Sequence, residues 1–116
     1  MEMNEAIQLI EKAFPHKVKN SQWVDLGCGA GTFTIALCYL LGSGSKIFAI
    51  DKQRQSITSS NDVEIEFVQD DFSNAIFPFS ILDGIMMANS FHYIKDKPLL
   101  IEKLSRHLGS EGKLII

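Results

Sequence analysis

The chain has 116 residues, of which 46% are hydrophobic and 22% are charged, a balance typical of one globular domain and not of a disordered chain. Eleven lysines and arginines against 14 aspartates and glutamates give a formal net charge of -3. The chain therefore lacks the overall positive charge that holds nucleic acid by bulk electrostatics, and the composition disfavours nucleic acid as a partner.

The cysteines and the apolar runs bear on metal binding and location. Cys28 and Cys38 are the two cysteines, and neither belongs to a CxxC pair, which argues against a disulfide framework and against a metal site. Unpaired cysteines without a signal peptide are typical of the reducing cytoplasm. The longest apolar run, 35–41, is far shorter than the roughly 20 residues that a membrane span needs. We expect a soluble cytoplasmic protein with no membrane partner.

The first predicted element is an amphipathic helix. Met3, Ile7, Ile10 and Phe14 recur at spacings of four, three and four residues, which places them on one face of a helix that ends at Pro15. A strand, a glycine-rich loop and an apolar helix follow. They are predicted at 23–26, 27–31 and 32–41, before a turn at 42–45.

After this turn, strands alternate with helices to the end of the chain. We expect strands at 46–50, 64–68, 83–88 and 113–116, helices at about 52–60 and 98–108, and a glycine turn at 109–112. Short strands that are apolar on both faces and separated by helices are typical of a parallel sheet with helices on both sides. All of these elements fit one domain spanning 1–116.

Polar residues and glycines gather where the predicted strands end. These positions are the loop 27–31, Asp51, Asp70, Asp71 and Asn89. Ligands of open parallel sheets bind at the carboxyl ends of the strands, near the point where strand order reverses. The sequence therefore predicts a ligand site at this edge of the sheet.

The glycine loop is the first part of that site. Alternate glycines between a strand and a helix let the backbone pass close to a ligand, and the helix after them offers a positive dipole end. A tight turn without a ligand is the alternative. The third glycine discriminates between ligand classes, because dinucleotide sites need it at position 32. Thr32 stands there instead and the third glycine is Gly31, which disfavours an NAD-type oxidoreductase.

Acidic residues after the second and third strands are the next candidates. Asp51 lies 20 residues past Gly31, the separation at which nucleotide-binding folds place a ribose-binding acid. A carboxylate at Asp71 could accept a hydrogen bond from an exocyclic amine such as that of adenine. Either residue could instead be a solvated acid at a strand end.

These residues carry a resemblance to a known family. Val24–Thr32 looks like the first motif of the class I S-adenosylmethionine-dependent methyltransferases, and Ala49–Asp51 is similar to their acidic second motif. Phe67–Phe72, Asp83–His92 and Gly109–Ile116 resemble the third motif, the fourth motif and the fifth strand. The resemblance implies a three-layer Rossmann-like α/β domain with a mainly parallel sheet in the order 3-2-1-4-5, and S-adenosylmethionine as the cofactor.

The resemblance also implies which residues contact the cofactor. They are Asp25, Gly27, Cys28, Gly29, Gly31, Asp51, Lys52, Asp71, Phe72, Ala88 and Asn89. The glycines would shape the loop around the methionine part, while Asp51 would hold the ribose and Asp71 with Phe72 the adenine. Asp25 would orient the methionyl amino group, which the backbone at Ala88 and Asn89 would also face.

The sequence says less about the molecule that would accept the methyl group. Asn89–His92 is not the Asn/Asp-Pro-Pro-Tyr motif of the amino-group methyltransferases, and it looks more like the members that act on small molecules. His92 could serve as the general base, because a histidine near its ordinary pKa suits that task, although capping or packing is the rival role. We expect methyl transfer to a small molecule. A non-catalytic cofactor-binding module, or the cofactor-binding half of a longer enzyme, is the alternative.

The last predicted strand raises two expectations. Members of the family usually add two further strands after the fifth, and these are not found before Ile116, so we expect the domain to be incomplete at its C-terminus. The outer edge of the strand at 113–116 has no predicted neighbour. An open strand edge recruits another strand, which predicts a homodimer through this edge.

Overall fold

The computed structural model describes residues 2–14, 18–58, 62–71, 82–88 and 94–116. Its strands form one five-stranded sheet in the order β3-β2-β1-β4-β5, in which every neighbouring pair is parallel. The strands are β1 (Gln22–Leu26), β2 (Lys46–Asp51), β3 (Glu64–Gln69), β4 (Leu82–Met86) and β5 (Leu108–Ile115). The predicted Rossmann-like fold and its strand order are thereby confirmed.

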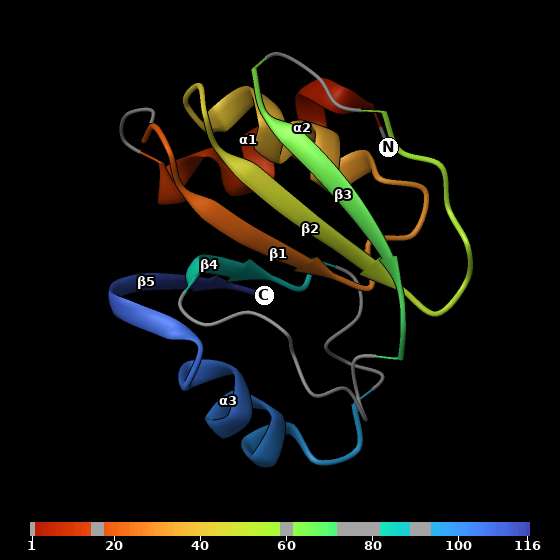
Figure 1. Ribbon diagram of the computed structural model, residues 1–116, viewed down its shortest axis with the longest axis vertical. Helices are drawn as coiled ribbons and strands as arrows, with labels where there is room; N and C mark the ends of the chain where they lie inside the picture. The colour runs from red at the N-terminus through yellow and green to blue at the C-terminus, as the bar shows by residue number, and fades with distance from the viewer. Residues whose placement is uncertain (1, 15–17, 59–61, 72–81, 89–93) are drawn as a thin grey trace.

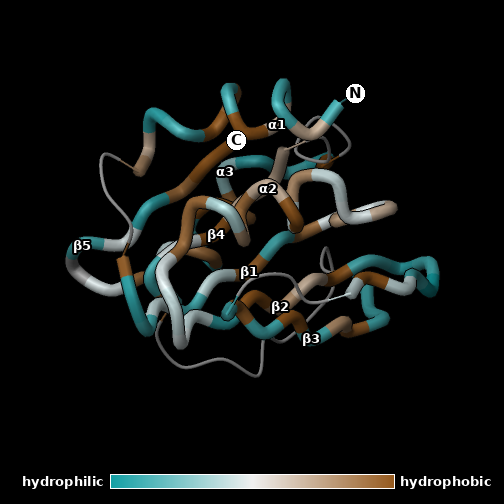
Figure 2. Tube along the Cα trace, turned by 90° about the horizontal axis from the view of Figure 1, so that it is seen from above, coloured by the Kyte–Doolittle hydropathy of each residue, from teal (hydrophilic) through white to brown (hydrophobic). Residues whose placement is uncertain are grey.

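Helices cover both faces of the sheet (Figure 1). They are α1 (Met3–Ile10), continued by the short 3₁₀ helix η1 (Glu11–Ala13), then α2 (Thr32–Leu40) and α3 (Lys97–Ser105). Figure 2 shows α1 alternating between hydrophilic outer turns and hydrophobic inner ones, as its sequence spacing predicts. Among the described residues, no helix is both long enough and apolar enough to cross a bilayer.

Two hydrophobic cores lie on opposite faces of the sheet. Ala6 and Ile10 of α1 and Leu37 of α2 pack in one core with Trp23 of β1. The other core joins Val24 and Leu26 of β1 to α3. Since successive strand residues face opposite sides, Asp25 lies on the Trp23 side of β1, which α2 covers.

α3 begins with a side-chain cap. The Asp96 carboxylate accepts the Leu99 backbone N–H at 3.1 Å, and Pro98 occupies the first turn, where its missing N–H costs nothing. This cap sets the start of α3 one residue before the predicted start. The helix ends at Ser105 and not at Leu108, because Leu108 already pairs with Leu82 as the first residue of β5.

Two predicted elements are wrong in the described residues. Residues 52–58 form no helix. This segment is polar apart from Ile57, and a short helix without an apolar stripe gains too little packing to form. The glycine turn predicted at 109–112 lies inside β5, where the register jumps from the pair Leu82–Leu108 to the pair Gly84–Lys113. The hydrogen bonds to β4 therefore continue past the glycines, which form an irregularity in the strand.

Candidate functional site

The loop between β1 and α2 is shaped by its glycines. Gly27, Gly29 and Gly31 have φ angles of +71°, +55° and +95°, a left-handed region that other residues adopt only with strain. A Cβ added at Gly31 would come within 2.9 Å of the Ile57 side chain. A Cβ added at Gly29 would meet no atom within 4 Å, so open space lies beside the middle of the loop.

Backbone hydrogen bonds fasten this loop to the end of β2. The amides of Gly27 and Cys28 donate to the Ile50 carbonyl at 2.8 and 3.0 Å. The next amide, Gly29 N–H, donates to Asp51 Oδ2 at 2.9 Å. Three consecutive N–H groups of the loop therefore hold it against the end of the second strand.

Asp25 lies directly before the loop with its side chain buried. The residue is 2% exposed, and the Thr34 hydroxyl donates to its Oδ2 at 2.5 Å. Burial raises the pKa of Asp25 to about 7, because desolvation disfavours the charged form; the Thr34 hydrogen bond lowers this pKa and the nearby Asp51 charge raises it.

The carboxyl group of Asp25 is only half satisfied. Thr34 is its one hydrogen-bond partner among the described residues, and no described cation pairs with it. No fully enclosed side-chain oxygen or nitrogen of these residues lacks a partner, so the second oxygen of Asp25 must reach open space. A nearly buried carboxyl group with one free oxygen is suited to accept a hydrogen bond from a cationic ligand.

Asp51 ends β2 with both carboxylate oxygens engaged. Oδ1 accepts the Gln53 backbone N–H at 2.9 Å, while Oδ2 accepts Gly29 N–H. Each carboxylate oxygen can accept a second hydrogen bond, and the residue is half-buried, so the group remains available to a ligand.

Cys28 contributes backbone to the loop and not a reactive thiol. Its side chain is buried, and Sγ lies 3.7 Å from the Gly29 carbonyl oxygen, to which it donates. Burial, reinforced by the Asp25 and Asp51 charges, raises the pKa of the Cys28 thiol to about 12. The thiol therefore stays protonated near neutral pH and is a poor nucleophile.

The other predicted contacts lie along the same edge of the sheet where they are described. Lys52 is exposed after β2, and Asp71 is exposed just beyond β3, where its N–H bonds Asp70 Oδ1 at 2.8 Å. Ala88 follows β4 and packs partly against the α2-side core. Phe72, Asn89 and His92 lie outside the described residues.

Sequence reasoning missed three residues that shape this site: Thr34, Gln53 and Ile57. Thr34 is a polar residue followed by the apolar run of its helix, which could have marked it as a buried hydrogen-bond donor. Gln53 completes an Asx turn two residues after Asp51, a local pattern that aspartate favours. Ile57, the one large apolar residue of its segment, covers the position where a side chain at Gly31 would lie.

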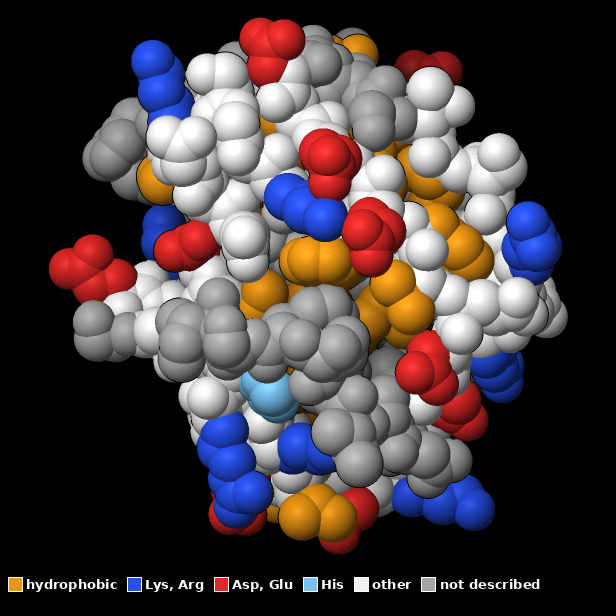
Figure 3. Space-filling view, viewed as in Figure 1, with side chains coloured by type: hydrophobic (Ala, Val, Ile, Leu, Met, Phe, Trp, Pro, Cys, Tyr) orange, Lys and Arg blue, Asp and Glu red, His pale blue; other side chains and the backbone are white. Residues whose placement is uncertain are grey.

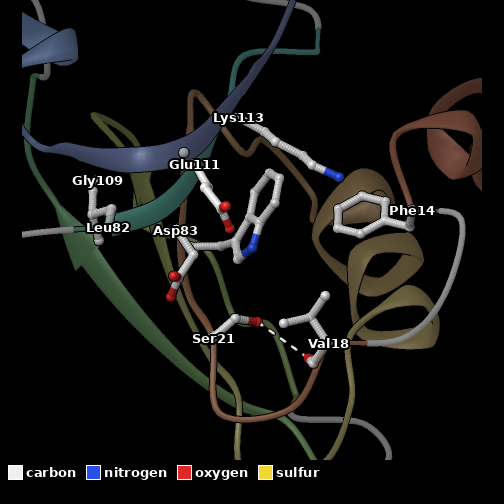
Figure 4. Close-up of a pocket in the computed structure, with 10 residues that line it drawn as sticks. Phe14, Val18, Ser21, Leu82, Asp83, Gly109, Glu111 and Lys113 are labelled. Atoms are coloured by element: carbon white, nitrogen blue, oxygen red, sulfur yellow. Dashed lines mark hydrogen bonds between the residues drawn. The ribbon is translucent and has the colours of Figure 1, made fainter.

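A separate cavity of about 480 Å³ lies near the amino ends of β1 and β4 (Figure 4). Phe14, Trp23, Asp83, Glu111 and Lys113 are among the residues that line it. None of the residues predicted to contact the cofactor belongs to its lining. The described residues include no group of His, Cys, Asp and Glu arranged to hold a metal ion.

Surface charge gives no sign of a basic groove on the face that Figure 3 shows. Acidic and basic side chains are interspersed there, and Lys46 is paired with both Glu64 and Glu66 at 3.0 and 3.1 Å. Such exposed pairs contribute little stability, but they neutralise the lysine.

Comparison with known proteins identifies relatives. Residues 17–116 match a family model described as "Methyltransferase domain". Over 35 residues the chain is 46% identical to the probable cobalt-precorrin-6B C(15)-methyltransferase (decarboxylating) of Pyrobaculum aerophilum, which is 30% of this chain and 18% of that protein.

Solved structures share the fold over almost the whole chain. Bacillus subtilis YcgJ has a TM-score of 0.66 and 16% identity, with 96% of this chain and 49% of that one covered. The putative methyltransferase in complex with the Haloferax volcanii Trm112 activator has a TM-score of 0.68 and 22% identity, with 96% of this chain and 48% of that one covered. Coclaurine N-methyltransferase bound to N-methylheliamine and SAH has a TM-score of 0.76 and 19% identity, with 96% of this chain and 34% of that one covered. The chain thus spans half or less of each of these proteins.

Proposed function

The chain belongs to the methyltransferase domain family, and from this membership we propose that it binds S-adenosylmethionine at the carboxyl edge of the sheet and transfers its methyl group to a small molecule. The observation that carries the proposal is one arrangement. A loop of glycines with positive φ angles and open space beside Gly29 is tied to Asp51 through the Gly29 N–H, and it directly follows Asp25, whose carboxyl group has one described hydrogen-bond partner.

The residues present fit this cofactor. The free oxygen of Asp25 suits the ammonium group of a methionine moiety, because a buried carboxylate without a described counter-ion gains from a cation. The remaining acceptor positions of Asp51 suit the two hydroxyls of a ribose. Gly29 leaves room for the chain that links them. We assign Asp71 and Phe72 to the adenine by resemblance alone.

When bound, S-adenosylmethionine supplies a methyl group already activated by a positively charged sulfur. The protein then has two tasks, which are to hold the acceptor in line with that methyl group and to exclude water. The fixed loop and Asp25 perform the first task on the cofactor side. We propose His92 as the base for acceptors that must lose a proton.

The single test is calorimetric titration of this chain with S-adenosylhomocysteine in the absence of any acceptor, with NADH as the matched control. We expect saturable binding of S-adenosylhomocysteine and none of NADH. No heat at millimolar S-adenosylhomocysteine would contradict the cofactor proposal. The NAD-type alternative is unsupported, since the matching family is one of methyltransferases.

Catalysis is tested separately from binding, because the chain spans half or less of the relatives compared. A methyl-transfer assay against phenols, quinols and amines is expected to show transfer to at least one of them. Binding without transfer to any acceptor would favour the cofactor-binding module instead. A cytoplasmic location and a homodimer through the outer edge of β5 stay predictions; in the described residues β5 is an edge strand.

A further inference from the structure

The two carboxylate oxygens of Asp51 are both occupied by backbone amides of the protein itself. Oδ2 accepts Gly29 N–H at 2.9 Å, and Oδ1 accepts Gln53 N–H at 2.9 Å. Binding of ribose hydroxyls alone does not require either of these hydrogen bonds. These two amides fix the carboxylate in one orientation, and in return the carboxylate fixes the backbone at Gly29.

Gly29 is the part of the loop that most needs this support. The amides of Gly27 and Cys28 are held by the Ile50 carbonyl, which is backbone and does not depend on any side chain. Gly29 N–H, in contrast, is held by a side chain. With its φ of +55°, Gly29 lies in a conformation that glycine can leave easily. The position of the loop beside the open space therefore depends on Asp51.

We infer that Asp51 is a positioning residue for the methionine half of the cofactor site, acting through Gly29 in addition to its contact with the ribose. This inference rests on the proposed function. The hydrogen bond from Gly29 to Asp51 connects the loop between β1 and α2 to the end of β2. Losing the carboxylate would loosen the loop even for the part of the ligand that Asp51 does not touch.

Two ligands separate the contact of Asp51 with the ribose from its support of the loop through Gly29. S-adenosylhomocysteine carries the ribose and the amino-acid tail, whereas 5′-methylthioadenosine carries the ribose without the tail. If Asp51 acts only on the ribose, Asp51→Ala weakens both ligands by the same factor. If Asp51 also holds the loop, S-adenosylhomocysteine loses about tenfold more affinity than 5′-methylthioadenosine, as expected for a hydrogen bond to a charged group. Equal factors would overturn the inference.

A second measurement needs no ligand. Amide hydrogen exchange of the unliganded wild type should show Gly29 N–H protected, and Asp51→Ala should remove this protection while Gly27 and Cys28 keep theirs. Fast exchange of Gly29 in the wild type would also overturn the inference, whether or not the variant folds. Asp51→Asn, which keeps the size of the side chain, repeats both measurements in case alanine disturbs the fold.

Asp62→Asn is the matched control, since it removes one carboxylate charge at an exposed position away from the loop. It should change neither the ligand ratio nor the exchange of Gly29. The outcomes also separate this inference from the proposed function. If the wild type binds no S-adenosylhomocysteine, the cofactor proposal fails, whereas equal losses for both ligands reject only the role of Asp51 in holding the loop.

Discussion

The two edges of the sheet differ in how their polar groups are satisfied. At the amino edge, where the cavity of about 480 Å³ lies, Asp83 Oδ2 accepts Gln22 N–H at 2.7 Å and the hydroxyls of Ser21 and Ser45 hydrogen-bond each other at 3.1 Å. The Lys113 ammonium group donates to the Ala13 carbonyl. Each of these groups has found its partner within the chain.

The carboxyl edge has the opposite character. Asp25 is nearly buried, yet one of its oxygens has no partner among the described residues, and open space lies beside Gly29. An unmet hydrogen bond of a buried group costs stability, and such groups persist where a ligand uses them. The comparison favours the carboxyl edge as the candidate ligand site, because its buried carboxyl group has a hydrogen bond left to make, whereas the polar groups at the amino edge have theirs within the chain.

The largest effect is expected at Gly29. Gly29→Val puts a β-branched side chain at a φ of +55° and fills the open space beside the loop, so binding of S-adenosylhomocysteine should become undetectable by calorimetry. The strain should lower the free energy of unfolding by about 1–3 kcal/mol.

Gly44→Ala is the control at the amino edge. Gly44 has a φ of +78°, and an added Cβ would collide with the Asn20 side chain, so the variant should also lose stability. Its folded fraction should still bind the ligand with wild-type affinity. If Gly29→Val folds and binds normally, the loop is a plain turn and the contrast between the edges is lost.

The next effect is the pH dependence that Asp25 creates. Its pKa is about 7 in the folded protein, against 3.8 for a solvent-exposed aspartate, so the unliganded protein is stabilised by protonated Asp25 at low pH and loses that contribution as pH rises from about 4 to 7. The difference corresponds to at most about 4 kcal/mol. Cofactor affinity should change in the opposite direction, because a methionyl ammonium group needs the ionised carboxylate.

Asp25→Asn tests both halves of this prediction. Denaturant unfolding of the variant should lose this pH slope, and its affinity for S-adenosylhomocysteine should fall about tenfold or more at pH 8 and change little with pH. The described titratable groups that interact with Asp25 are Asp51 of β2, whose charge raises the pKa of Asp25, and the Cys28 thiol of the loop, which stays protonated and uncharged. As the control, Asp83→Asn at the amino edge should leave the pH dependence of stability and of affinity as in the wild type. A wild-type affinity for S-adenosylhomocysteine that does not change between pH 6 and 8 would remove Asp25 from the site.

Much of the fold could be predicted from local sequence. The first three strands are each followed directly by a polar residue or glycine, and the order 3-2-1-4-5 followed from a resemblance carried largely by those strand ends. The helix predicted at about 52–60 is wrong over the described residues 52–58, because this polar segment has no apolar face for the sheet to bury. The glycines at 109–112 indicated a turn, yet pairing with β4 kept them within a strand.

The site shows the same division between local and tertiary information. Asp51 and the loop glycines stand out in the sequence because residue type and spacing alone carry the signal. The hydrogen bond from Thr34 to Asp25 does not, because it exists only once α2 covers the face of β1 that Trp23 and Asp25 share. No periodicity in either segment reports that contact.

The smallest effect is expected from Thr34, and it tests whether that tertiary contact matters for binding. Thr34 is fully buried and donates to Asp25 Oδ2, a bond that lowers the pKa of Asp25 against the effect of burial. Thr34→Val keeps the shape and removes the hydroxyl, so the pKa of Asp25 should rise further. The pH at which affinity for S-adenosylhomocysteine is half-maximal should then move upward, with a loss of about tenfold or less near pH 7.

Ser45→Ala is the matched deletion of a buried hydroxyl at the amino edge. Ser45 bonds the Ser21 hydroxyl and accepts the Ser21 N–H, each at 3.1 Å, so its loss should cost about 1 kcal/mol or more of stability. It should not move the pH profile of binding, since Ser45 has no contact with Asp25. Calorimetric titrations of both variants from pH 6 to 9 would separate the two roles. If both variants shift the profile equally, the shift reflects general loosening of the fold, and Thr34 has no specific part in setting the charge of Asp25.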